Sequence, residues 1–256
     1  MELNRDYESA AIYKWRKKRK KAFVLFICIV GICFLVTRMV RVEDKTTVKV
    51  HNMHTEQNEK AIRYVASNMI KEDPKIAITF DDGPSPAWTP QLLDGLKERN
   101  VKATFFLIGE NAKNNPELVK REAEEGHLIG NHTYHHVEIT RVPDETAQEE
   151  ILMTNEVITG ITGDEVSYMR PPFGVWQKNL ERKLDVMPVL WTIDPLDWTT
   201  DNEDEIINKV VTQAGENDII LLHDCYESSV NAALRIVDIL QKEGFEFVTV
   251  DELIMN

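Results

Sequence analysis

The chain has 256 residues, an apolar fraction of 43% and a formal net charge of −13, which is enough sequence for one or two domains with a real core. The charge is unevenly spread, because residues 1–41 carry 10 Lys/Arg against 3 Asp/Glu, whereas residues 42–256 carry 20 against 40. An acidic body argues against a nucleic-acid partner, since phosphate binding requires clustered cations. No protein partner is predicted either.

The first predicted element is a transmembrane helix. Residues 14–21 are strongly basic, and residues 22–37 are uncharged over 16 positions before Met39 and Val40 extend the apolar side. A membrane span needs about 20 residues, with a lower limit of about 17. No small-x-small cleavage site follows, which favours an uncleaved signal anchor over a cleaved signal peptide.

The positive-inside rule sets the expected orientation. Residues 1–21 form a cytoplasmic tail, residues 22–40 form the anchor, and the acidic body lies outside the cytoplasm. We therefore expect a single-pass protein of the cell membrane. Residues 41–74 are polar with a weakly amphipathic middle, and they predict either a flexible linker or a short docked helix. Cys225 is the only cysteine of the body, which excludes an intrachain disulfide there.

From Lys75 onward, short apolar runs alternate with amphipathic segments. Thr89 and Asn115 are predicted N-caps, each followed by a proline at the first helical position, and Gly126 ends the second helix. Strands are expected at 75–80, 102–109, 127–132, 167–172, 187–194, 218–224 and 245–250, and helices at 89–100, 115–126, 143–163, 177–184, 203–214 and 229–244.

This alternation predicts a mainly parallel sheet with helical crossovers. The segment from Lys75 has about 180 residues, which is small for a full eight-fold barrel of about 250. An incomplete, distorted barrel and an open doubly wound sheet both fit the pattern. In either architecture, ligands gather beyond the carboxyl ends of the strands.

Five of the predicted strands end in ionisable side chains. Each feature alone is typical of a turn, a helix cap or a surface ion pair. Their coincidence at one edge of the sheet predicts a functional site instead. The side chains are Asp81 and Asp82, the histidines of "NHTYHH" (131–136), Arg170, Asp194 with Asp197 and Trp198, and His223 with Asp224.

The histidine segment offers two pairings. Helical spacing would place His132 on one face with either His135 or His136, and the segment alone favours neither. Two imidazoles and one carboxylate make a three-ligand set that leaves positions open on Zn²⁺ or a similar ion. A neighbouring carboxylate can take a proton from water, a distant histidine can protonate a leaving amine, and Arg170 can keep a carboxylate ionised. The composition of the site predicts a metal-dependent hydrolase of an amide or ester.

The ordered stretches "TFDDGP", "HTYHH", "RPPFG", "DPLDW" and "LLHD" resemble the motifs of the polysaccharide deacetylase family, carbohydrate esterase family four. The resemblance covers essentially all of residues 75–250. It implies an α/β fold of the distorted, incomplete (β/α) barrel type, mainly parallel, with residues 75–256 as the catalytic domain.

The resemblance also implies a metal centre and a base. Asp82, His132 and His136 match the family's ligands for one divalent ion, for which Zn²⁺ is expected and Co²⁺ or Ni²⁺ are alternatives. His135 falls on a free position of the motif and receives no role. Asp81 matches the catalytic base.

The remaining family positions surround the substrate. Arg170 resembles the residue that orients the base, and Asp197 resembles the acid that orients His223, the general acid. The backbone N–H of Phe173 is expected to bind the oxyanion; many members have Tyr there, so contacts through that hydroxyl are lost. Trp198 and Leu222 resemble walls of the pocket for the acetyl methyl group.

The expected activity is removal of acetyl groups from N-acetylglucosamine units of an extracytoplasmic glycan, with peptidoglycan as the favoured polymer. N-acetylmuramic acid, chito-oligosaccharides and O-acetylated xylan are alternative substrates. A wall-glycan binding protein without activity is the non-enzyme alternative, and the complete set of catalytic residues argues against it.

Overall fold

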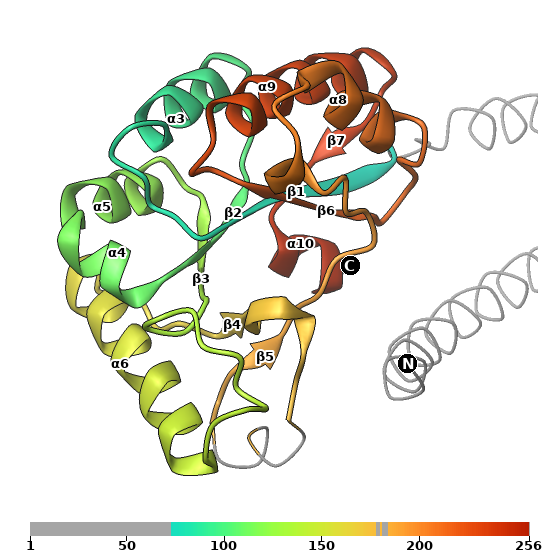
Figure 1. Ribbon diagram of the computed structural model, residues 1–256. Coiled ribbons are helices and arrows are strands. Elements are labelled where there is room, and N and C mark those ends of the chain that lie inside the picture. The colour runs from blue at the N-terminus through green and yellow to red at the C-terminus, as the bar shows by residue number, and fades with distance from the viewer. Residues whose placement is uncertain (1–72, 178–179, 181–183, 256) are drawn as a thin grey trace, which may run out of the picture. The chain divides into compact units, whose positions relative to one another are not determined.

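The computed structural model describes residues 73–177, 180 and 184–255 (Figure 1). In this part of the chain, no helix combines the length and the apolar character needed to span a membrane. The expected anchor at 22–40 and nearly all of the expected linker at 41–74 lie outside the described residues. Most of the helix expected at 177–184 also lies outside them.

The centre of the described chain is a parallel sheet that curls around the site. Its strands lie in the order β5-β4-β3-β2-β1-β6, and β7 pairs with the start of β1. All of the pairings are parallel, as the strand–helix alternation predicts. The strands are β1 Lys75–Asp81, β2 Thr104–Leu107, β3 Leu128–Asn131, β4 Tyr168–Met169, β5 Met187–Pro188, β6 Ile219–His223 and β7 Glu246–Phe247.

The strand expected at 187–194 is mostly irregular. Only β5 is regular, and a single parallel bridge between Ile193 and Ile220 places this segment beside β6. The carbonyl groups of Val189 and Leu190 accept hydrogen bonds from the Arg170 side chain, so they are taken away from a sheet ladder. A buried guanidinium therefore replaces part of the strand pairing, and the barrel is incomplete and distorted.

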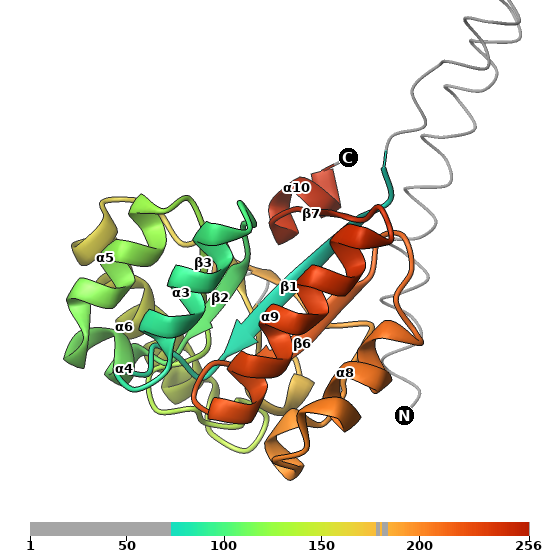
Figure 2. The same ribbon diagram turned by 90° about the horizontal axis from the view of Figure 1, so that it is seen from above.

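Helices cover the outer face of the sheet. Figure 2 shows α9 lying over β1 and β6, with α3 on one side of it and α8 on the other. The helices are α3 Thr89–Glu98, α4 Gly109–Asn114, α5 Pro116–Glu124, α6 Asp144–Thr162, α8 Glu203–Val211, α9 Glu227–Lys242 and α10 Val250–Met255, with short 3-10 turns η1 Pro172–Gly174 and η2 Asp197–Thr199.

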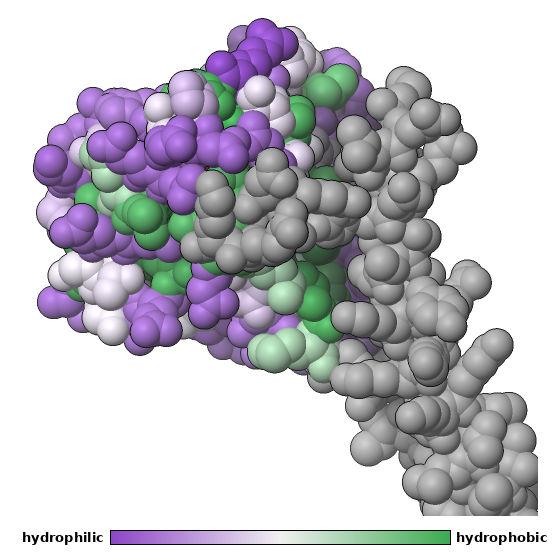
Figure 3. All heavy atoms as spheres, turned by 90° about the horizontal axis from the view of Figure 1, so that it is seen from below, coloured by the Kyte–Doolittle hydropathy of each residue, from purple (hydrophilic) through white to green (hydrophobic). Residues whose placement is uncertain are grey.

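The main core lies between the sheet and these helices. Ile78, Phe80 and Leu222 are fully buried there, and each such side chain contributes about 1.5–3 kcal/mol of transfer free energy. Hydrophilic residues occupy much of the surface, with hydrophobic ones scattered between them, on the face seen in Figure 3. The core holds the strands rigidly, so their carboxyl ends can position polar side chains accurately.

Several local predictions were wrong in detail. The structure has two helices, α4 and α10, in places where the sequence predicted strand ends or loop. Thr89 is the first residue of α3 and not its cap; its hydroxyl accepts a hydrogen bond from the Ser85 N–H at 2.7 Å. Asn115 precedes α5 as expected, but its side chain donates to the Asn111 carbonyl and does not cap the helix. Gly126 follows α5 with φ of +82°, as predicted for a glycine that ends a helix.

Candidate active site

The carboxyl end of β1 sends two consecutive carboxylates in different directions. Asp81 is the last residue of the strand, and it lies opposite His223 in the register with β6. Asp82 follows with φ of 71°, which turns the chain out of the extended conformation. Asp81 therefore contacts Arg170, whereas Asp82 faces the histidines.

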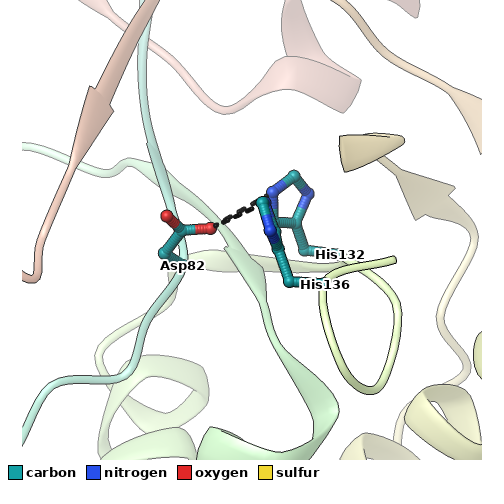
Figure 4. Close-up of side chains that lie close together, drawn as sticks. All are labelled: Asp82, His132 and His136. Atoms are coloured by element: carbon teal, nitrogen blue, oxygen red, sulfur yellow. Dashed lines mark ion pairs between the residues drawn. The ribbon is translucent and has the colours of Figure 1, made fainter. Parts of the chain in front are cut away.

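Two histidines meet on Asp82. The Nε2 atoms of His132 and His136 each lie 3.3 Å from Oδ1 of Asp82, and Figure 4 shows both rings turned toward this oxygen. The segment after β3 is not helical, because Thr133 and His136 have φ of 61° and 56°. The assumption of a helical turn in this segment was therefore wrong. His132 and His136, the pair that matches the family motif, nevertheless lie together at Asp82.

His135 points elsewhere. Its Nδ1 lies 2.7 Å from Oε1 of Glu150 on α6. The other oxygen of Glu150 accepts the backbone N–H groups of Tyr134 and His135. The third histidine thus helps to fasten the loop to α6, and it does not join the Asp82 cluster.

The cluster of Asp82, His132 and His136 fits a divalent metal ion. One ligand atom from each residue lies within 4.8 Å of the other two. Oδ1 of Asp82 is buried and has no hydrogen-bond partner in the described chain. Nδ1 of His132 lies 2.6 Å from the carbonyl oxygen of Arg170. That oxygen can only accept, so Nδ1 carries the hydrogen and Nε2 offers a lone pair, which is the arrangement of a metal-ligating histidine.

The charge states of the cluster agree with this fit. Burial lowers the pKa of His136, despite the opposing charge of Asp82, and so favours the neutral imidazole that binds metals. Burial alone would raise the pKa of Asp82, but the neighbouring imidazoles of His132, His136 and His223 lower it below its ordinary value. These pKa shifts favour a neutral imidazole at His136 and a carboxylate at Asp82, which are the forms that bind a metal ion.

Arg170 is a fully buried cation beside Asp81. Its Nη1 donates to Oδ1 of Asp81 at 2.8 Å and to the hydroxyl of Thr79 at 2.7 Å, and the Phe106 ring lies 4.3 Å from its guanidinium carbon. Burial lowers the pKa of Arg170 and Asp81 opposes that effect. Removing one partner of such a buried pair costs about 3–5 kcal/mol. Oδ2 of Asp81 remains on the side of His132, 3.8 Å from its Nε2.

His223 and Asp197 form the wall of the site that faces the Asp82 cluster. Oδ1 of Asp197 lies 2.8 Å from Nδ1 of His223, and Oδ2 accepts the His223 backbone N–H at 2.9 Å. Burial alone would lower the pKa of His223, but the hydrogen bond and charge of Asp197, together with the charges of Asp81 and Asp82, raise it to about 9. Nε2 of His223 faces the cluster of Asp82, His132 and His136, at 4.0 Å from Oδ2 of Asp82. The ring is therefore protonated at neutral pH and directed into the site.

The three predicted substrate contacts occupy different environments. Phe173 is 63% exposed, and its ring lies 5.0 Å from that of His136. Trp198 is 56% exposed and follows Asp197 in η2. Both can meet a ligand at the rim of the site. Leu222 is fully buried in the main core, and its assignment as a pocket wall stays a prediction.

Left-handed backbone is concentrated at the site. Among the described residues other than glycine, seven have positive φ, and five of these belong to the segments that build the site. Such conformations cost about 1–3 kcal/mol each and persist where function requires them. The five residues are Asp82, Thr133, His136, Phe173 and Leu196.

Asp224 packs beside the site, and the sequence analysis assigned it no role. It is fully buried, it accepts a hydrogen bond from the Thr89 hydroxyl, and burial raises its pKa to about 7. A Cβ atom added to Gly83 would lie 2.5 Å from its Oδ1. The carboxyl group thus packs against the turn that follows Asp82. Its only signal in the sequence is its place at the end of a buried strand.

Comparison with known proteins agrees with this geometry. Residues 68–189 match the family model described as polysaccharide deacetylase. A peptidoglycan-N-acetylglucosamine deacetylase of Listeria monocytogenes is 37% identical over 216 residues, which cover 82% of this chain but only 46% of that protein. The chain thus spans about half the length of this relative. A peptidoglycan-N-acetylglucosamine deacetylase of Bacillus cereus is 38% identical over 199 residues, covering 75% of this chain and 93% of that protein.

Among solved structures, the peptidoglycan deacetylase PdaC from Bacillus subtilis has a TM-score of 0.69 and 39% identity, covering 71% of this chain and 90% of that one. The curled parallel sheet is therefore shared with this known deacetylase. The chain belongs to the polysaccharide deacetylase family.

Proposed function

We propose that the protein is a metal-dependent N-deacetylase that acts on N-acetylglucosamine units of peptidoglycan. One observation carries the proposal. Asp81 and His223 lie on two sides of the Asp82 cluster, and each is held by its own partner, Arg170 or Asp197. A base, an acid and a metal site thus converge on one point, as amide hydrolysis requires.

A divalent ion bound by Asp82, His132 and His136 would act as a Lewis acid that polarises the acetyl carbonyl and makes a water molecule more acidic. Asp81 accepts the proton of the attacking water, since Arg170 holds one of its oxygens and leaves the other facing the cluster. The water oxygen bonds to the acetyl carbon. The backbone N–H of Phe173 is our proposed donor to the resulting oxyanion.

His223 completes the reaction. The C–N bond breaks, acetate leaves, and the sugar nitrogen takes a proton from Nε2 of His223. A pKa of about 9 keeps His223 protonated at neutral pH, so it is ready to donate. Asp197 holds the ring in the required orientation through Nδ1.

The resident metal is proposed to be Zn²⁺, with Co²⁺ and Ni²⁺ as alternatives, because two imidazoles and one carboxylate suit all three ions. Elemental analysis of the purified protein tests the identity. Amide hydrolysis that survives complete removal of metal by a chelator would contradict the metal mechanism.

The substrate proposal is supported by the names of the relatives, which include deacetylases of peptidoglycan N-acetylglucosamine, of peptidoglycan N-acetylmuramic acid and of chito-oligosaccharides. The test is a panel of purified cell wall, N-acetylglucosamine oligomers and acetylated xylan, analysed by mass spectrometry. We expect free amines on glucosamine units of the wall. Amines on muramic acid, or release of acetate from xylan alone, would reassign the substrate. Glycan binding without hydrolysis, unaffected by Asp81→Asn, would support a binding protein instead.

The location is proposed from the sequence alone. Residues 22–40 would anchor the protein in the cell membrane and place residues 75–256 on the glycan side. Protease treatment of intact cells tests this topology: the catalytic domain should be digested while an epitope in residues 1–21 remains protected.

A further inference from the structure

A pocket next to His223 has no part in the reaction proposed above. It has a volume of about 500 Å³. It adjoins His223, because Cys225 and Tyr226 lie two and three residues after His223 in the chain and the Tyr226 ring lies 6.3 Å from the His223 ring. A group bound there would be attached to a sugar close to the one that reacts. The pocket is lined by Trp88, Asp201, Glu203, Cys225, Tyr226, Glu227, Ser228 and Asn231.

Two walls of this pocket suit a sugar ring. Trp88 and Tyr226 provide aromatic surface, and Tyr226 is 42% exposed. Aromatic faces are flat, rigid and apolar, and they carry a negative electrostatic potential. They therefore suit the C–H faces of a pyranose. Polar groups around the aromatic walls can orient the ring.

The charges of the pocket are unbalanced. Glu203 is paired, since it accepts from Asn231 at 3.0 Å and from Arg235 at 3.2 Å. Asp201 and Glu227 are exposed and form no ion pair or side-chain hydrogen bond with any described residue. None of the lining residues is Lys, Arg or His. An anionic ligand is therefore disfavoured, although the pocket lies at the start of α9, where the helix dipole alone would favour one.

Ser228 also lines the pocket. The residue is 8% exposed, and its hydroxyl has no hydrogen-bond partner among the described residues. The hydroxyl is therefore available to a polar group of a ligand in the pocket.

We propose that this pocket is a subsite for a hexosamine unit that carries a free amino group. The ammonium group would lie between Asp201 and Glu227, with the sugar ring against Trp88 and Tyr226. The inference rests on the proposed function, because N-deacetylation produces such units next to acetylated ones. The protein would then bind partly deacetylated glycan more tightly than fully acetylated glycan, and would extend runs of free amines.

Binding tests the subsite without turnover. The full-length chain with Asp81→Asn is titrated calorimetrically with a partly deacetylated tetramer, the amino tetramer, which keeps an N-acetyl group beside its free amines, and with N-acetylglucosamine tetramer. We expect tighter binding of the amino tetramer. Adding Asp201→Asn and Glu227→Gln should weaken it about three- to tenfold, the range for two partly exposed charge pairs, and should leave the acetylated tetramer unchanged. The matched control is Asp164→Asn with Glu165→Gln, the same loss of charge at exposed residues after α6.

Equal affinity for the two tetramers, or an equal loss in the control, would overturn the subsite. A lysine-containing peptide that binds as tightly and is equally sensitive to Asp201→Asn and Glu227→Gln would assign the ammonium to a peptide and overturn the sugar assignment.

Kinetics separate this inference from the proposed function. For the otherwise wild-type chain, the Asp201→Asn, Glu227→Gln variant should raise KM for partly deacetylated oligomers by the same factor and leave kcat on fully acetylated oligomers unchanged. Hydrolysis with no discrimination by these variants would overturn the subsite alone. Discrimination in binding with no hydrolysis of any glycan would overturn the proposed function alone.

Discussion

The two walls of the site differ in how they are held together. On the His223 wall, Asp197 and His223 form a paired unit with two hydrogen bonds, of 2.8 and 2.9 Å. On the opposite wall, Asp82 faces two imidazole nitrogens at 3.3 Å, and its Oδ1 has no hydrogen-bond partner in the described chain. The His223 wall is complete by itself, whereas the Asp82 wall needs a cation. We infer from this difference that the His223 wall suits a proton donor and the Asp82 wall suits a metal ion.

The largest effect should come from removing a ligand on the Asp82 wall. His132→Ala and His136→Ala should each weaken metal binding by at least about 100-fold, since even residues behind the ligands contribute about 10–100-fold. Metal content after dialysis and calorimetric titration with Zn²⁺ measure the loss. Full metal occupancy in either variant would show that the cluster is not the metal site.

The next largest effect should be a loss of kcat without a loss of metal. His223→Ala should lower kcat by about 10²–10⁴-fold, the usual contribution of general acid–base catalysis, while metal content stays at the wild-type level. Asp81→Asn should also lower kcat and leave the metal content unchanged, because Asp81 contacts Arg170 and is not one of the proposed metal ligands. A variant that loses both kcat and metal would show that the two walls are not independent.

A smaller effect should appear in the pH dependence of Asp197→Asn. Burial lowers the pKa of His223, but the hydrogen bond and charge of Asp197, together with the charges of Asp81 and Asp82, raise the folded-state value from 6.5 to about 9. The pair therefore stabilises the fold fully below pH 6.5, and this contribution is lost as the pH rises through about 9. The difference in Tm between the wild type and Asp197→Asn should be largest below pH 6.5 and shrink toward pH 9. The alkaline limb of kcat/KM should also move to lower pH in the variant. A Tm difference that is constant with pH would contradict this assignment.

The smallest effect is expected at His135. His135→Ala should leave metal affinity and kcat near wild type, because the His135 side chain contacts Glu150 and is 53% exposed. The free energy of unfolding should change by about 1 kcal/mol or less. This variant is the matched control for His132→Ala and His136→Ala, since it removes the same side chain from the same loop. A large loss of metal would refute the distinction among the three histidines.

Much of the fold could be predicted from the sequence. Alternating strands and helices predicted the parallel sheet, and the ionisable residues after five strands identified its functional edge. Boundaries were less accurate where side chains compete with the backbone. The strand expected at 187–194 is one case, because the Arg170 guanidinium takes the carbonyls of Val189 and Leu190. The helix cap expected at Thr89 is another case, because the Thr89 hydroxyl is hydrogen-bonded to the Ser85 N–H and the Asp224 carboxyl group.

The residue types at the strand ends could be identified without the structure, and the ordered motifs of the chain indicated the family. The sequence could not decide between His135 and His136 from spacing, because left-handed residues at Thr133 and His136 replace the helical turn on which that spacing argument depends. Nor could it show the burial of Asp224 against Gly83 or the unpaired carboxylates beside Tyr226. Periodicity reports local backbone preference, whereas these contacts join segments that are distant in the chain. Only the tertiary structure brings such segments together and fixes the direction of each side chain.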